Sequence, residues 1–461
     1  MNLHDKKILV LGLGDTGLSV VRWGERMGVC IRVADSRSDP PGLPELRSRH
    51  PGVDVRLGAF AGDVFDDAEL AVASPGVAVA GPACDPAIAC ARAAGKEIIG
   101  DVELFARYLN ALDQGRRPQV IGITGSNGKS TVTAMAGAMC RTAGANTVVA
   151  GNIGLPVLDA LAESEKSGTP DVYVLELSSF QLETTSNLHL AAAAMLNLSQ
   201  DHLDRYDSMA AYAQAKKRIF LQTATQVLNR DDAASMTMRV RSKRVVTFGT
   251  DEPAGANQFG LSGSHLCEGA LPLMRLADVP VAGLHNASNA LAAFALTRAL
   301  NLPAAALADG LRHFEGLPHR FQKVGEIRGV SFYDDSKGTN VGSTVAALNG
   351  MTCPVVLIAG GEGKGQDFTP LAGPVRRHSR AVVLIGRDAD AIGNALGSSG
   401  VPMLRAASMA DAVAMALDAA DSGDAVLLSP ACASFDMFQN YKHRGDIFAQ
   451  CVRNLATKER G

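Results

Sequence analysis

The segment from Ile121 to Thr131, which reads I-G-I-T-G-S-N-G-K-S-T, constrains the fold of this chain most strongly. The apolar run at 120–123 precedes the loop glycines Gly125 and Gly128, and Lys129 begins the stretch that follows. This order predicts a buried strand, a tight loop and a helix, which together direct several backbone N–H groups at one point. We therefore predict a triphosphate site, although the common spacing G-x-x-x-x-G-K-[ST] would need glycine in place of Ile123. The predicted loop residues are Gly125, Ser126, Asn127, Gly128, Lys129, Ser130 and Thr131.

The length, charge balance and cysteine spacing of the chain argue against several classes of protein. A chain of 461 residues is too long for one core, so we expect several domains. Lys plus Arg number 44 against 47 acidic residues, a balance that gives no sign of a nucleic-acid or membrane surface. The 8 cysteines form no C-x-x-C pair, which favours reduced thiols over a disulfide frame or a zinc site. With neither a signal-peptide core nor a membrane-length apolar run, we expect a soluble cytoplasmic protein.

The first segment carries a glycine-rich turn. A strand at 7–11 leads into Gly12-Leu13-Gly14-Asp15-Thr16-Gly17 and a helix, and a second strand ends in Asp35. Taken alone, this fingerprint favours NAD. It specifies only a diphosphate on a helix N-terminus and a hydroxyl near the acid, however, so any nucleotide diphosphate with a sugar would fit. Another strand at 70–73 ends in Ser74, where a ligand could also lie. A structural turn without a ligand is the alternative at both places.

Two polar residues follow buried strands beyond the phosphate loop. Glu176 ends the apolar run at 172–175, and His202 follows the run at 191–198. Ligands gather at the carboxyl ends of strands in parallel sheets, so we expect both near Lys129. An acid in this position is a candidate Mg²⁺ ligand. A solvated glutamate and a structural histidine are the plainer alternatives.

Lys216 interrupts an apolar helical stripe. In a helix expected at 208–221, apolar residues recur with helical spacing, and Lys216 falls inside their stripe. Burial would lower its pKa unless an anion meets it. The side chain could reach outward to solvent, or its neutral amine could react with CO2 to form a carbamate.

The remaining segments complete the predicted organisation. Residues 250–282 are expected to be irregular, and His285-Asn286-Ala287-Ser288-Asn289 leads a helix whose amides could read an adenine edge or cap the helix. Beyond 318, four strands at 330–333, 355–359, 381–385 and 425–428 alternate with helices. The loops after these strands carry Lys337, Thr339, Lys364 and Ser434, which suit a small dicarboxylate or are simply solvated.

We thus predict an α/β protein of three domains. Residues 1–113 form a Rossmann-like domain, 114–317 a central P-loop ATPase-like domain, and 318–461 a second Rossmann-like domain. Polar stretches near 110–118 and 317–320 mark the junctions.

These patterns, taken over nearly the whole chain, resemble the Mur ligases of peptidoglycan synthesis. The stretches that carry the resemblance are Gly12 to Gly17, T-G-S-N-G-K-S-T at 124, G-N-I-G at 151, L-E-L-S-S-F-Q-L-E at 175, D-H-L-D-R-Y at 201, H-N-A-S-N-A at 285, G-L-P-H-R at 316, D-S-K-G-T-N at 335 and S-P-A-C-A-S-F-D at 429. The glycine pattern of the first domain and S-P-A-C-A-S point to the branch that adds D-glutamate.

The resemblance implies an ATP-dependent ligase that joins D-glutamate to UDP-N-acetylmuramoyl-L-alanine through an acyl phosphate. Lys129 would stabilise the transferring phosphoryl group. A first Mg²⁺ would be held by Ser130 and Glu176, and a second by His202 and a carbamylated Lys216. The partners would be small molecules only, and we expect a monomer.

The resemblance also implies where each substrate lies. Beyond the loop, ATP would be positioned by Asn289, Arg320 and Asp335. The UDP sugar would contact Asp15, Thr16, Asp35, Ser36, Arg37, Ser74 and Asn152. D-Glutamate would contact Lys337, Thr339, Lys364, Ser434 and Tyr441. Two positions depart from the family pattern: Asp15 brings a negative charge to the diphosphate loop, and Tyr441 stands where phenylalanine is expected.

Three other interpretations remain at this point. A sister Mur ligase or a folylpolyglutamate-synthetase-like ligase would share the central domain, although the first 113 residues argue against a folate enzyme. An NAD-dependent oxidoreductase would leave the central domain unexplained. A nucleotide-gated binding protein would keep the phosphate loop but would have no need for Lys216, Lys337 and Lys364 together.

Overall fold

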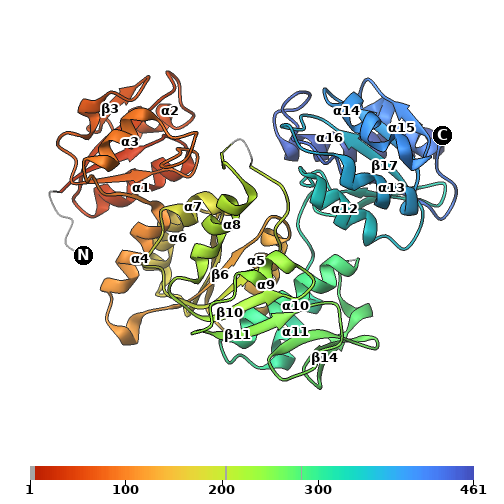
Figure 1. The fold of residues 1–461 in the computed structure, drawn as a ribbon, viewed down its shortest axis with the longest axis horizontal. Helices are drawn as coiled ribbons and strands as arrows, with labels where there is room; N and C mark the ends of the chain where they lie inside the picture. Colours follow the sequence, from red (N-terminus) through yellow and green to blue (C-terminus); the bar gives the residue numbers. More distant parts are fainter. Residues whose placement is uncertain (1–5, 203–204, 282, 461) are drawn as a thin grey trace.

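Three β-sheets organise the chain, each at the centre of one lobe (Figure 1). The computed structural model describes residues 6–202, 205–281 and 283–460. In Figure 1 the first lobe (red to orange) and the third lobe (blue) lie at opposite ends of the central lobe (green). These three α/β lobes confirm the predicted fold class. No helix in the described ranges combines the length and apolarity needed to cross a membrane.

The first lobe has a five-stranded parallel sheet in the order β3-β2-β1-β4-β5. Its strands are β1 (Lys7–Leu11), β2 (Cys30–Asp35), β3 (Asp54–Leu57), β4 (Leu70–Ala73) and β5 (Ile98–Gly100). Its helices are α1 (Asp15–Arg26), α2 (Leu43–Arg49) and α3 (Pro86–Ala93), and α4 (Asp101–Ala111) leads to the central lobe. Because the strands are parallel, the turns after β1, β2 and β4 share one edge of the sheet.

The central lobe has a nine-stranded sheet in the order β14-β13-β12-β11-β10-β9-β6-β8-β7. Its strands are β6 (Gln119–Thr124), β7 (Thr147–Gly151), β8 (Val172–Glu176), β9 (Leu190–Met195), β10 (Thr223–Asn229), β11 (Arg244–Phe248), β12 (Gln258–Ser262), β13 (His265–Glu268) and β14 (Leu271–Arg275). Its helices are α5 (Lys129–Thr142), α6 (Val157–Ser167), α7 (Ser179–Glu183), α8 (Met209–Lys217), α9 (Ala233–Thr237), α10 (Leu284–Arg298) and α11 (Ala304–Arg312).

Two predictions for the central lobe were wrong in detail. The stretch expected to be irregular contains β12, β13 and β14, which form an antiparallel extension of the sheet over residues 258–275. These strands are short, and their turns place Gly263 and Gly269 at positive φ, so the segment lacks any long periodic run. The helix expected at 208–221 ends at Lys217 and continues as a 3₁₀ turn, Arg218–Phe220, which keeps Ile219 and Phe220 in the core.

The third lobe has a six-stranded sheet in the order β15-β16-β20-β17-β18-β19. Its strands are β15 (Gln322–Ile327), β16 (Val330–Asp334), β17 (Val355–Gly360), β18 (Ser379–Ile385), β19 (Met403–Arg405) and β20 (Ala425–Leu428). Its helices are α12 (Val341–Asn349), α13 (Ala372–His378), α14 (Ala389–Leu396), α15 (Met409–Asp418) and α16 (Tyr441–Arg460). Only β15 runs antiparallel to its neighbour among the paired strands described.

Helix α4 joins the first and central lobes into one packed unit. Phe105 of α4 meets the ring of Tyr173 on β8 edge to face, with centroids 5.1 Å apart. The Glu103 carboxylate accepts hydrogen bonds from the backbone N–H of Ser186 at 2.7 Å and of Asn187 at 2.9 Å. This helix therefore fixes the first sheet against the central one.

Asp101, the first residue of α4, lowers the stability of the folded protein because its carboxylate is buried. Its side chain is 1% exposed, and neither carboxylate oxygen has a well-formed hydrogen bond among the described residues. Burial raises its pKa from 3.8 to about 6, with the backbone N–H of Val102 opposing the shift. The folded protein therefore holds a proton that the unfolded chain releases. Stability falls as pH rises from about 4 to about 6 and is level above that range.

Replacing Asp101 with asparagine should remove this pH dependence. The unfavourable contribution at pH 7 is about 3 kcal/mol, from a shift of about two pKa units. We expect the melting temperature of Asp101→Asn, relative to the natural protein, to rise between pH 4.5 and pH 7.5. Thermal unfolding at both pH values measures this, and an equal difference at the two values would contradict the assignment.

Candidate active site

The phosphate loop joins β6 to α5 and is braced from β9. Gly128 lies in the left-handed region with φ of 83°, where it directs the chain into α5. The Asn197 side chain, just beyond β9, accepts from the Asn127 N–H at 2.8 Å and donates to the Asn127 carbonyl at 3.0 Å. The Ser126 hydroxyl donates to the Ser199 carbonyl at 3.0 Å. The loop is thus preorganised at the carboxyl edge of the sheet.

Two lysines converge on one carbonyl of this loop. Lys129 Nζ donates to the Gly125 oxygen at 2.9 Å and to the Ser126 oxygen at 2.9 Å. Lys216 Nζ, from α8, donates to the same Gly125 oxygen at 2.8 Å and lies 4.6 Å from the centroid of the Tyr212 ring. The Lys216 side chain is 1% exposed, so it does not reach outward to solvent.

This arrangement favours an anion. Burial lowers the pKa of Lys129, and burial together with the neighbouring Lys129 charge lowers the pKa of Lys216 well below its ordinary value. Asp201 and Glu176 oppose both shifts. Two ammonium groups on a neutral carbonyl repel each other, so a phosphate, or a negative group on Lys216 itself, would relieve the repulsion.

Glu176 ends β8 beside the loop with half of its carboxylate unpaired. Its Oε1 accepts from Asn152 Nδ2 at 2.6 Å, whereas its buried Oε2 has no hydrogen-bond partner among the described residues. An unpaired buried carboxylate oxygen is costly, and a cation would satisfy it. Within the described ranges, no three His, Cys, Asp or Glu side chains converge as a metal cluster. The residues therefore fit a cation held by one carboxylate together with other oxygens.

His202 lies in an aromatic setting with φ of 55°. Its ring meets that of Phe180 edge to face at 4.8 Å, and its Nε2 is 3.7 Å from Asp201 Oδ2. Tyr212, which also lies against Lys216, is 6.1 Å away between ring centroids. The Tyr212 ring thus lies close to both His202 and Lys216. The approach of His202 to Lys129 stays a prediction.

The third lobe reaches directly into the phosphate loop. Arg320 Nη2 donates to the Ser130 hydroxyl at 2.6 Å. Asn340 Nδ2 donates to Asn127 Oδ1 at 3.0 Å and to Asp201 Oδ2 at 3.4 Å. Loop and third lobe therefore form one continuous site.

A cavity at this junction contains the predicted nucleotide contacts. Asn289, Arg320 and Asp335 line it together with Gly128 and Thr131. Burial raises the pKa of Asp335 to about 7, although its carboxylate accepts from the Ser429 hydroxyl at 2.7 Å. Asn289 Nδ2 bonds Asn286 Oδ1 at 3.1 Å, and both amides line the cavity. The adenine interpretation of the H-N-x-x-N segment is therefore favoured by position.

The loop after β16 lines part of this cavity. Lys337 Nζ sits 3.9 Å from the centroid of the Tyr441 ring, and burial lowers the pKa of Lys337 to about 8. Ser434 is buried in the loop after β20, Thr339 is half-buried, and Lys364 is exposed with φ of 54°. These side chains follow strands β16, β17 and β20, whose ends share one edge of the third sheet.

The predicted sugar-nucleotide contacts in the first lobe lie at the carboxyl edge of its sheet, whereas Asn152 lies in the central lobe against Glu176. Ser74 Oγ donates to the Gly12 carbonyl at 2.9 Å, which ties the turn after β4 to the glycine loop. Asp35 is already engaged, because it accepts from the Leu13 N–H at 2.6 Å and pairs with Arg37 at 2.7 Å. Around this loop, Asp15, Ser36 and Arg37 are exposed and Thr16 is half-buried.

Sequence reasoning missed two residues that organise the site. Asn197 lies within the apolar run at 191–198. A single polar residue in that run is the signal that could have identified it. Asn340 belongs to the D-S-K-G-T-N stretch but was given no role. It caps α12 by accepting from the Ser343 N–H at 2.9 Å while it also bonds the phosphate loop.

The fold and the site together define a class of protein. It is a phosphate-loop enzyme with three α/β lobes, in which the third lobe closes over the phosphate loop of the central lobe. Three family profiles match in order along the chain. They are described as "Mur ligase MurD-like, N-terminal domain" (residues 6–100), "Mur ligase middle domain" (residues 123–297) and "Mur ligase, glutamate ligase domain" (residues 319–432). The chain belongs to the Mur ligase family.

Similar proteins cover the whole chain. A UDP-N-acetylmuramoylalanine--D-glutamate ligase from Methylobacillus flagellatus is 54% identical, covering 100% of this chain and 99% of its own. The enzyme of that name from Thiobacillus denitrificans is 56% identical, covering 99% and 98%. The crystal structure of UDP-N-acetylmuramate-alanine ligase MurC from Thermotoga maritima shares the fold at a TM-score of 0.59 and 19% identity, covering 97% of this chain and 99% of that one.

Proposed function

We propose that this protein is an ATP-dependent ligase that adds D-glutamate to UDP-N-acetylmuramoyl-L-alanine in peptidoglycan precursor synthesis. The observation that carries the proposal is the closure of the phosphate loop by the third lobe, through Arg320 on Ser130 and Asn340 on Asn127. A nucleotide on that loop meets the lobe whose strand ends carry Lys337 and Ser434. The names of the full-length relatives supply the substrates.

The residues support a two-step reaction. The acceptor carboxylate is a poor electrophile, so its oxygen attacks the γ-phosphorus of ATP and forms an acyl phosphate, while the bond between the γ-phosphorus and the β-phosphate oxygen breaks and ADP leaves. Lys129 and Arg320 stabilise the charge that develops on the transferring phosphoryl group. The amine of D-glutamate then attacks the acyl carbon, and inorganic phosphate leaves with the carboxylate oxygen.

Each lobe has its own substrate in this proposal. The first lobe, residues 1–113, holds the UDP sugar along the turns after β1, β2 and β4. The central lobe, residues 114–317, holds ATP, and Asn152 contacts the acceptor beside Glu176. The third lobe, residues 318–461, holds D-glutamate on Lys337, Thr339, Lys364, Ser434 and Tyr441.

Mg²⁺ fits the donors near the loop. Ser130 and Glu176 would hold a first Mg²⁺, and His202 and a carbamylated Lys216 would hold a second; both would neutralise the charge of the phosphates. The unpaired Glu176 oxygen and the crowded position of Lys216 support this set. A carbamate would replace the repelling ammonium with an anion.

We also propose that the enzyme acts as a monomer in the cytoplasm. The 8 cysteines are all free, in keeping with a reducing compartment.

Phosphate release with the acceptor, scanned across amino acids of both hands, tests the proposal. We expect release that depends on UDP-N-acetylmuramoyl-L-alanine and strongly favours D-glutamate. Tight NAD binding without ATP turnover would point to an oxidoreductase, and a preference for another amino acid would point to a sister ligase.

Arg320→Lys tests the closure of the loop by the third lobe. Lysine keeps the charge but loses the planar fork that reaches Ser130, so we expect kcat/KM for ATP to fall about tenfold or more. Arg328→Lys is the matched control, because Arg328 is exposed in the same lobe and pairs with Glu459. Equal kinetics for the two variants would show that the contact with Ser130 is not used.

A further inference from the structure

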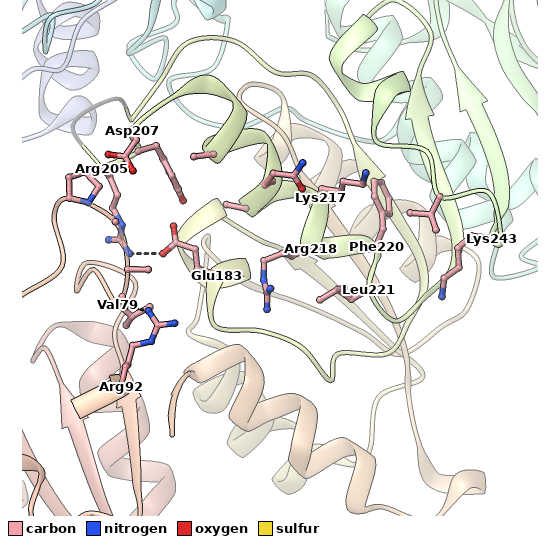
Figure 2. Close-up of a pocket in the computed structure, with 18 of the residues that line it drawn as sticks. Val79, Arg92, Glu183, Arg205, Asp207, Lys217, Arg218, Phe220, Leu221 and Lys243 are labelled. Carbon is pink, nitrogen blue, oxygen red and sulfur yellow. Dashed lines mark hydrogen bonds and ion pairs between the residues drawn. The ribbon is translucent and has the colours of Figure 1, made fainter. Parts of the chain in front are cut away.

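A second large cavity lies between the first and central lobes (Figure 2). Its volume is about 770 Å³, within the range of sites for small organic ligands. The first lobe contributes residues 79–82 and Arg92, and the central lobe contributes Glu183, the outer face of α8, the 3₁₀ turn after it and residues 240–243. None of the residues assigned above to ATP, the UDP sugar or D-glutamate lines this cavity.

Arg205 forms part of one wall of the cavity and makes contacts with both lobes. From the central lobe, its Nη1 donates to the Pro75 carbonyl of the first lobe at 2.8 Å. Its Nη2 pairs with Glu183 at 3.2 Å, and its guanidinium lies 4.1 Å from the centroid of the Phe180 ring. Because Arg205 is only 8% exposed, these contacts between the lobes are buried.

The lining carries an excess of positive charge. Its cations are Arg92, Arg205, Lys217, Arg218 and Lys243, against Glu183 and Asp207. Glu183 neutralises Arg205, but Arg92 and Arg218 donate to neutral acceptors, the Val79 carbonyl for the first and the Leu182 and Thr185 carbonyls for the second. Among the described residues, Lys217 and Lys243 have no hydrogen-bond or ion-pair partner for their ammonium groups. This excess favours an anion.

Apolar surface lies beside these cations. Phe220, Leu221 and Val240 line the central-lobe side, and Val79 and Pro82 line the first-lobe side. Leu221 is 48% exposed, so its side chain is open to contact with a ligand. Figure 2 shows Leu221 between Arg218 and Lys243, with Arg92 across the cavity.

We propose that this cavity binds an organic anion with an apolar body. The carboxylate, sulfonate or phosphate of the ligand contacts Lys217 and Lys243, and its apolar part covers Leu221. The site is separate from the three substrates of the proposed reaction, and its occupant could be bound while the reaction proceeds.

Fluorescence titration with 8-anilinonaphthalene-1-sulfonate, an aromatic anion, tests the site on the full-length protein. ADP and UDP are present at saturation to fill the catalytic cleft. We expect the double variant Lys217→Ala/Lys243→Ala to weaken binding about tenfold, from the loss of two partly exposed charges. Lys217→Arg/Lys243→Arg should restore it. Lys166→Ala, at an exposed lysine of α6 outside the cavity, is the matched control and should change binding less than about twofold.

The uncharged analogue N-phenyl-1-naphthylamine separates charge from general apolar binding. Its affinity should be unchanged by the lysine variants, while Leu221→Ser should weaken both probes. Equal binding of the anion to the natural protein and the alanine double variant would overturn the proposal. Displacement of the anion by ADP and UDP would also overturn it, because the probe would then lie in the catalytic cleft.

Discussion

Lys129→Ala should lower turnover about a hundredfold or more, the scale of losing one donor to transition-state charge. In the structure Lys129 donates to the Gly125 and Ser126 carbonyls at 2.9 Å, within the loop proposed to receive the phosphates. Its ammonium is thus held at the proposed phosphoryl-transfer site. Steady-state phosphate release with both co-substrates saturating measures the effect.

The control for Lys129 is Lys166→Ala, which removes an exposed lysine from the same lobe. We expect its turnover to match that of the natural protein within about twofold. Turnover of Lys129→Ala within about threefold of the natural protein would contradict the assignment of the loop as the phosphoryl-transfer site.

Lys216→Ala should be inactive, with turnover reduced at least a hundredfold. The buried amine shares the Gly125 carbonyl with Lys129, and the lowering of its pKa by burial and by the Lys129 charge favours the neutral form that reacts with CO2. The resulting carbamate places an anion next to the predicted cation site. A short carboxylic acid should therefore partly restore activity to the alanine variant, because it supplies the missing carboxylate.

Three observations would separate this role from simple packing. Bicarbonate labelled with ¹³C should give a carbamate signal in the natural protein and none in Lys216→Ala. Lys217→Ala, one residue along α8, should keep its activity. Full activity of the natural protein in CO2-free buffer would rule out the carbamate.

Local patterns predicted the parts of the site that lie on single strand ends. The glycine spacing around Lys129 and the position of Glu176 after an apolar run each follow from one stretch of chain. Lys216 could be singled out because an ammonium inside an apolar stripe is costly. In each case burial and backbone geometry were encoded within about a dozen neighbouring residues.

Contacts between lobes could not be predicted in the same way. The bonds from Arg320 to Ser130 and from Asn340 to Asn127 join residues about 200 positions apart, and no local periodicity specifies them. The shared carbonyl under Lys129 and Lys216 likewise depends on how α8 packs on the loop. The β12–β14 extension was missed because short strands between glycine turns resemble loops.

Asp35 shows how a correct pattern can leave a role open. Its position at the end of β2 was predicted, together with a ribose hydroxyl as partner. The carboxylate instead accepts from Leu13 and pairs with Arg37. A ribose would have to share these donors or displace Arg37, so its contact with the sugar stays a prediction.

Formation of the acyl phosphate is the step of the proposed reaction that requires the substrates of the separate lobes to meet. Isotope transfer tests this step most directly. The acceptor carboxylate is labelled with ¹⁸O, and the phosphate released in a single turnover with D-glutamate is examined by mass spectrometry. If the carboxylate attacks the γ-phosphorus beside Lys129, one labelled oxygen leaves with each phosphate. Unlabelled phosphate, released at the same rate as the amide product, would contradict the mechanism.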